Sequence, residues 1–190
     1  MASSLIANAI QVNFDSVLGF PDNERMVNMF KALESTGLRG FLGCPSVLYE
    51  QSLEQFFDTA YLRENEIISA VLGKFVGISE EQFAGVFELP MTGLTDMTEV
   101  SKDLVYDARS IFPKSGEPVK TSCKKRKMKY EFRFLNDILA MSVTVKAGSF
   151  DAVTHERFLL TAIHFGLKIN WSKILFDILK EMVTKSSKQA

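Results

Sequence analysis

The sequence predicts a mainly α protein, a compact helical domain of about six to seven helices with one small β-hairpin. Two observations carry this prediction. Apolar residues recur at helical spacing along most of the chain, and only one stretch has the turn and β-branched residues of a hairpin. The chain has 190 residues, 46% of them hydrophobic, and its 16 phenylalanines supply bulk for a core. Length and composition therefore favour one folded domain.

The first two helices are predicted from their caps and apolar faces. Asp22 is expected to cap a helix that ends at Gly37, and the glycine-rich residues 37–43 are expected to form a connection. Ser46 is expected to cap the second helix. The apolar faces of the two helices consist of Met26, Met29, Phe30 and Leu33, and of Tyr49, Leu53, Phe56, Phe57 and Ala60.

The hairpin is predicted for residues 66–72 and 75–78, around the pair Gly73-Lys74. A Gly-X pair at this position is typical of a type II′ turn. Ser79 and Gln82 then have the spacing of a capping box, which predicts that a third helix starts here. Pro90 disfavours helical geometry at the residue before it, so this helix is expected to stop there.

Four further helices are predicted from the spacing of apolar residues and from residues that start or end helices. They are expected at about 101–111, 130–141, 154–165 and 171–183. Asp151 or Thr154 is expected to cap the third of these, and Gly166 to close it. The domain organisation is then an N-terminal extension (1–20), a single helical domain (21–185) with a mobile basic loop (112–128) inside it, and a frayed tail (186–190).

The charge of the chain is unevenly distributed. The total is −1, but residues 114–133 alone carry +6, which leaves −7 for the rest. The basic side chains of this segment are Lys114, Lys120, Lys124, Lys125, Arg126, Lys127, Lys129 and Arg133. Such a concentration of positive charge in an otherwise acidic chain indicates an anionic partner.

The densest part of this segment is the basic run, which consists of Lys124, Lys125, Arg126, Lys127 and Lys129. Runs of this kind bind nucleic-acid phosphates or serve as nuclear-import signals. The alternative is a solvated charge run in front of a helix. Tyr130 and Phe132 interleave with the cations, and we expect these rings to serve helix packing rather than base stacking.

Catalytic chemistry finds no support in the sequence, so we expect no enzyme, no cofactor and no metal. His155 and His164 lie nine residues apart on one predicted helix and therefore face opposite sides, which disfavours a shared site. Cys44 and Cys123 lack the spacing of a zinc site. The N-terminus has no basic region followed by an apolar run, and no stretch is apolar enough to span a membrane. We therefore expect an intracellular protein, nuclear or cytoplasmic.

Several strings together resemble a plant family of transposon proteins derived from retroelements. The strings are Met29–Leu38, Phe56-Phe57, Ile78–Phe83 with Leu89-Pro90, Val153–Ile163, and Gly166 with Ile169–Trp171. They span about residues 26–183, nearly the whole chain, and they are helical signatures rather than catalytic ones. The resemblance implies a retroelement lineage, membership of longer reading frames, and no catalytic residues to carry over.

Charge and resemblance together lead to one functional hypothesis and one alternative. The hypothesis is a non-enzymatic, gag-like domain of a transposable-element protein that acts by binding nucleic acid, by self-association, or by both. The alternative is a domesticated nuclear interaction module whose basic run is an import signal. The expected partners are a nucleic acid, a protein or a second copy of the chain, with no membrane and no small-molecule substrate.

Overall fold

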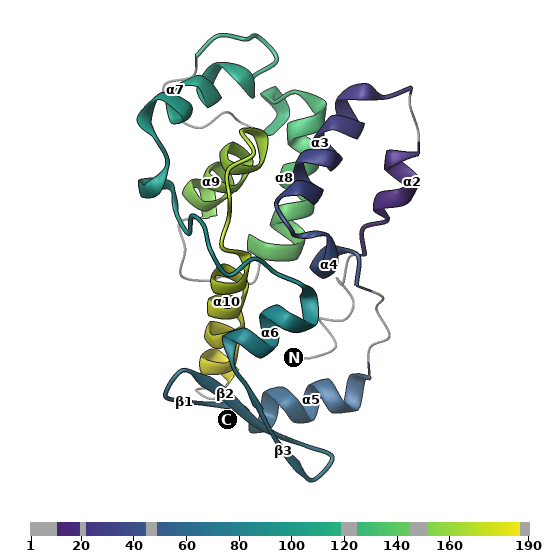
Figure 1. Ribbon diagram of the computed structural model, residues 1–190, viewed down its shortest axis with the longest axis vertical. Helices are drawn as coiled ribbons and strands as arrows, with labels where there is room; N and C mark the ends of the chain where they lie inside the picture. The colour runs from purple at the N-terminus through teal and green to yellow at the C-terminus, as the bar shows by residue number, and fades with distance from the viewer. Residues whose placement is uncertain (1–10, 20–21, 45–48, 119–124, 145–151, 187–190) are drawn as a thin grey trace.

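Figure 1 shows the computed structural model of the protein, which describes residues 11–19, 22–44, 49–118, 125–144 and 152–186. The protein is mainly helical with a small antiparallel sheet, as the sequence predicts, although the sheet has three strands instead of two. More helices form than the six to seven expected. The α-helices of the described residues are α2 (Phe14–Leu18), α3 (Glu24–Ser35), α4 (Arg39–Leu42), α5 (Glu50–Thr59), α6 (Glu80–Phe87), α7 (Lys102–Ile111), α8 (Tyr130–Leu139), α9 (Ala152–His164) and α10 (Trp171–Ser186).

The core lies between α3, α8, α9 and the first half of α10. The largest side chains of the main core cluster include Phe30, Phe158 and Trp171, all 1% exposed or less. From this cluster α10 runs to the sheet at the other end of the molecule (Figure 1). There Phe176 and Val183 join Ile67 in a second, smaller cluster. Helix α10 therefore ties the two ends together, in line with the apolar face predicted for it.

Helix α3 forms where the sequence predicts it, but its cap differs by one residue. Asn23, rather than Asp22, is the N-cap, and its side-chain oxygen accepts a hydrogen bond from the Met26 N–H (3.4 Å). Both residues are good caps, so the pattern alone does not distinguish them. Gly37 follows the helix with φ of +85°, as expected of a glycine that closes a helix.

The glycine-rich connection expected at 37–43 contains a short helix, α4. Leu38 and Leu42 flank its single turn and are buried in the main core, which explains why the chain coils there. Gly40 is required by a close approach, because a Cβ at this position would lie 2.3 Å from the Phe87 carbonyl oxygen. The glycine thus lets α4 contact the end of α6.

The sheet consists of β1 (Tyr61–Arg63), β2 (Glu66–Val71) and β3 (Lys74–Ile78), paired antiparallel in that order. Strand β1 is missing from the prediction. The predicted type II′ turn at Gly73-Lys74 is wrong, because Val71 pairs with Lys74 and the turn residues are therefore Leu72 and Gly73. Both have positive φ (50° and 73°), which is the geometry of a type I′ turn.

Helix α6 begins with the predicted capping box. The Gln82 N–H donates to the Ser79 hydroxyl oxygen (3.2 Å), and the Ser79 N–H donates to the Gln82 side chain (3.0 Å). The helix ends at Phe87, earlier than Pro90 requires, and its C-cap Glu88 adopts a left-handed conformation. Helices α7, α9 and α10 lie close to their predicted ranges, while Ser46 and Asp151, two of the predicted caps, lie outside the described residues.

Residues 11–19, part of the expected N-terminal extension, pack onto the domain. Phe14 of α2 is 3% exposed and meets the Phe30 ring edge to face, with the ring centroids 5.6 Å apart. The Val12 N–H donates to the Leu42 carbonyl (2.9 Å). Hydrophobic burial and a backbone bond thus join this segment to α3 and α4.

Candidate nucleic-acid interface

The predicted basic loop is held by backbone hydrogen bonds at both of its ends. The Lys114 N–H donates to the Lys127 carbonyl (2.9 Å), and the Lys129 N–H donates to the Phe112 carbonyl (2.9 Å). Pro113 and Met128 form the β-bridge between these bonds, and Met128 is buried. Residues 125–127 form a 3₁₀ turn, η2, directly before α8. The ends of the expected loop at 112–128 are therefore fixed, and residues 119–124 lie outside the described residues.

The cations of the basic run differ in their surroundings. Lys125 forms an ion pair with Asp137 of α8. Arg126 and Lys127 are exposed, and no carboxylate of the described residues forms an ion pair with either of them. Lys129 is half-buried at the N-cap of α8. Lys124 lies outside the described residues. Two side chains of the run thus present uncompensated positive charge on a fixed turn.

The outer face of α8 adds aromatic rings to this charge. Tyr130 is 55% exposed and Phe134 is 38% exposed. The two ring planes are nearly parallel, inclined by 10°, with centroids 6.3 Å apart. The guanidinium carbon of Arg133 lies 5.5 Å from the Tyr130 centroid. The expectation that the rings serve packing is right for Phe132, which is buried, and wrong for Tyr130.

The periodicity of α8 explains this division. Phe132, Leu135 and Leu139 recur at three- and four-residue intervals and are all 7% exposed or less, so they face the core. Tyr130 and Phe134 are one turn apart and fall on the opposite side. The spacing of the buried residues is the sequence signal that indicates which rings remain outside.

Two carboxylates, Glu156 and Asp137, interact with Lys125. Burial raises the pKa of Glu156, against the opposing effects of a hydrogen bond from Asn136 and of the Lys125 charge. Asp137 takes the direct ion pair with Lys125. The positive charge of Lys125 is therefore compensated by Asp137, and Arg126, Lys127, Lys129 and Arg133 remain as the cations of the interface.

His164 is the histidine whose side chain the structure describes. Within the described residues the His164 ring contacts Phe112, Phe132 and Phe165, with centroid separations of 5.0 to 6.1 Å. Burial, together with the nearby charge of Lys129, lowers the pKa of His164, which keeps the imidazole neutral at pH 7. The side chain of His155 lies outside the described part of the structure. His164 therefore contacts three phenylalanine rings, although its side chain remains exposed.

His164 also borders an open groove of about 290 Å³ between α3, α8 and α9, which Arg25 and Glu131 line as well. Small-molecule sites usually enclose about 300–1,000 Å³, so this groove is at the lower limit. In the ranges that the structure describes, no three His, Cys, Asp or Glu side chains gather to hold a metal ion. Cys44 is exposed, and Cys123 lies outside those ranges.

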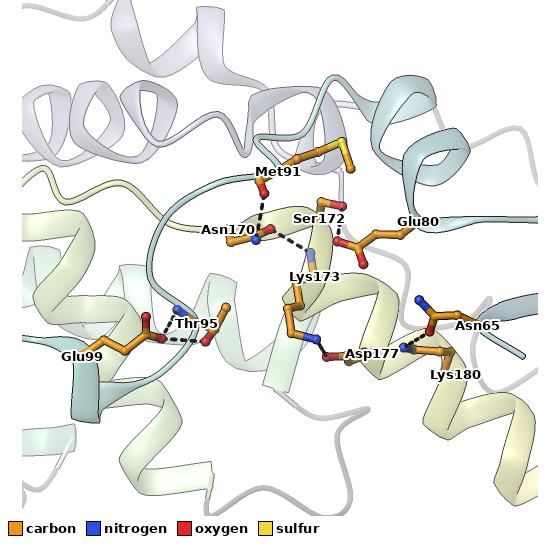
Figure 2. Close-up of polar contacts among 10 residues, drawn as sticks. All are labelled: Asn65, Glu80, Met91, Thr95, Glu99, Asn170, Ser172, Lys173, Asp177 and Lys180. Atoms are coloured by element: carbon orange, nitrogen blue, oxygen red, sulfur yellow. Dashed lines mark hydrogen bonds and ion pairs between the residues drawn. The ribbon is translucent and has the colours of Figure 1, made fainter.

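The second polar cluster of the molecule surrounds the start of α10 (Figure 2). The Asn170 side chain accepts from the Lys173 N–H (3.0 Å) and donates to the Met91 carbonyl (2.9 Å). The buried Ser172 hydroxyl donates to Glu80 of α6 (3.0 Å). These bonds cap α10 and fix the 90–94 segment against it, so the polar atoms of this cluster hold elements together.

The same cluster continues along α10 to the sheet. Asp177 lies between Lys173 (3.1 Å) and Lys180 (2.7 Å), and Lys180 also donates to the Asn65 side chain (3.2 Å) in the β1–β2 turn. Figure 2 shows both lysines directed at neighbouring oxygen atoms. Their charges are compensated locally, in contrast to those of Arg126 and Lys127.

Comparisons with known proteins do not extend this description. No protein-family model, curated protein or solved structure matches the chain. None of the helices in the described ranges combines the length and the apolar character that crossing a membrane requires. The basic turn and the outer face of α8 are therefore the features that indicate a function.

Proposed function

We propose that this chain is a non-enzymatic domain that binds single-stranded nucleic acid through Arg126, Lys127, Lys129 and Arg133. The observation that carries the proposal is the exposure of Arg126 and Lys127 on a turn that backbone hydrogen bonds hold in place. Exposed cations raise the local concentration of polyanions, and each phosphate contact releases counterions. Two exposed rings beside the cations favour single strands over duplexes.

A retroelement lineage is the second part of the proposal, and it rests on the resemblance of the helical strings. A gag-like domain needs to hold a nucleic acid and to associate with copies of itself. The basic turn supports the first requirement. The exposed edge strand β3 supports the second, because its Phe75 side chain is 83% exposed and an unpaired edge is a template for strand pairing.

The test of the proposal is the salt dependence of binding to a labelled oligouridine. The triple variant Arg126→Gln/Lys127→Gln/Lys129→Gln removes three phosphate contacts, and each contact contributes about 0.7 to the log–log slope on a single strand. We expect the slope to become about 2 units flatter, with an unchanged circular dichroism spectrum. An unchanged slope would overturn nucleic-acid binding at this surface.

The matched control is Lys74→Gln/Lys102→Gln/Lys168→Gln, which removes the same charge from three exposed lysines elsewhere. It leaves the slope within error if the contacts are local to the interface. Light scattering on the same samples measures self-association, and a monomer at every concentration would remove that part of the proposal.

A nuclear-import role is the alternative that the exposure of Arg126 and Lys127 also favours. In this case the triple variant leaves oligouridine binding unchanged and moves a fluorescently tagged protein from the nucleus to the cytoplasm. The two readouts separate the two functions.

A further inference from the structure

Helix α8 presents an aromatic surface that the core uses only in part. We call Tyr130, Arg133 and Phe134 the α8 platform. Phe134 contacts the Phe30 ring on its inner side (centroids 6.3 Å apart), and Tyr130 lies further out. Folding alone does not explain the more exposed ring of Tyr130, since a polar residue would satisfy that position equally well.

The platform has the parts that unpaired bases require. The two ring planes are within 10° of parallel and therefore offer faces of one orientation to a flat ligand. The Arg133 guanidinium, 5.5 Å from the Tyr130 centroid, adds a cation to the same surface. Arg126, Lys127 and Lys129 precede the rings in the chain, on the turn that leads into α8.

We propose that the α8 platform stacks an unpaired nucleobase on Tyr130 or Phe134, while the cations of the basic turn contact the flanking phosphates. The inference rests on the proposed function and deepens it, because it names the ligand as a single strand with accessible bases. The charge of the surroundings selects this occupant over an apolar protein segment. Arg133 contacts the Tyr130 ring, and three further cations lie on the turn and at the N-cap just before α8, so an apolar partner would have to desolvate charged groups.

The first experiment compares probes on the wild-type protein. A labelled oligouridine and an abasic strand of the same length and phosphate number differ only in their bases. We expect the oligouridine to bind ~5- to ~150-fold more tightly, the range that corresponds to ~1–3 kcal/mol for one base stack. Equal affinity for the two probes would overturn the platform, whatever the variants do.

The second experiment compares variants. Tyr130→Leu and Phe134→Leu keep apolar bulk and remove the π-face, and because both positions are partly exposed we expect the fold to hold. The variant at the stacking residue loses the preference for oligouridine over the abasic strand and keeps the salt slope of the wild type. If Tyr130 is that residue, Tyr130→Phe keeps the preference that Tyr130→Leu loses. If the double variant Tyr130→Leu/Phe134→Leu still preferred oligouridine over the abasic strand, the proposal would be contradicted.

The outcomes keep the inference separate from the proposed function. A flattened slope in the Arg126/Lys127/Lys129 triple variant, together with equal binding of base-bearing and abasic strands, supports phosphate binding and overturns the platform. A blunt-ended duplex of two complementary strands serves as a further probe, and we expect its affinity to be unaffected by the Leu variants because its bases are already paired and stacked. Oligodeoxyuridine, measured in parallel, shows whether the ligand is RNA, DNA or both.

Discussion

The start of α10 and the outer face of α8 are both rich in charged and polar groups, but they use them differently. At α10, Asn170 and Ser172 bond to neighbouring elements, and Lys173 pairs with Asp177 of the same helix. At α8, Arg126 and Lys127 have no ion-pair partner among the described residues. Groups that satisfy one another hold a fold together, whereas exposed charges on an anchored turn remain available to a ligand. A structural cluster and a candidate binding site therefore differ in whether neighbouring groups neutralise their charges, and not in how many charges they carry.

The largest effect on stability is expected for Trp171→Ala. The Trp171 side chain is fully buried, and its Nε1–H donates to the Thr36 hydroxyl (3.1 Å) at the end of α3. We expect a loss of about 3–5 kcal/mol in the free energy of unfolding, from the lost burial and the cavity left behind. Urea denaturation measures it. A loss below about 1 kcal/mol would mean that α10 does not anchor the core.

A smaller loss is expected for Asn170→Ala. The substitution removes the cap of α10 and the bond to the Met91 carbonyl, which together contribute about 1–2 kcal/mol. Oligouridine affinity at a temperature where the variant is folded should not change. A weaker affinity with unchanged stability would reverse the roles that we assign to the two regions.

The smallest effect is expected at Asp177. Burial opposes its ionisation, but hydrogen bonds from Lys180 and Lys173 outweigh burial and lower its pKa. A lowered folded-state pKa stabilises the protein above the unfolded value of about 3.9, and this stability is lost as the pH falls through the folded-state pKa. Asp177→Asn should therefore cost less than about 1 kcal/mol at pH 7, and less still near pH 2.

Thermal unfolding at the two pH values measures this difference. Lys74→Gln serves as its control, since Lys74 is exposed and no carboxylate of the described residues pairs with it. A loss of equal size at both pH values would show that the Asp177 side chain acts by shape rather than by charge.

The capping box of α6 depends only on neighbours in sequence and was predictable, whereas α4 and β1 depend on distant contacts and were not. The capping box of Ser79 and Gln82 involves four consecutive residues, so its chemistry can be read directly. Helix α4 coils because Leu38 and Leu42 reach the core, which no local pattern reveals. Strand β1 is only three residues long and exists through its pairing with β2.

The candidate site divides in the same way. The positive charge of Arg126 and Lys127 is evident from the sequence, but the compensation of Lys125 by Asp137 depends on how the chain folds back along α8. The position of Tyr130 was predictable in principle, because Phe132, Leu135 and Leu139 indicate the buried face. It was missed because an aromatic residue in an amphipathic helix is ordinarily part of the core.

The complete burial of Trp171 also gives the molecule a spectroscopic property. It is the only tryptophan of the chain, and its indole lies between α10 and the end of α3. Its emission therefore reports on one location, and a red shift signals that water has reached the contact between these helices. Tyr130 absorbs at shorter wavelength and is partly exposed to solvent. Excitation at the red edge of the aromatic band can thus follow unfolding through Trp171 with little contribution from the surface of α8.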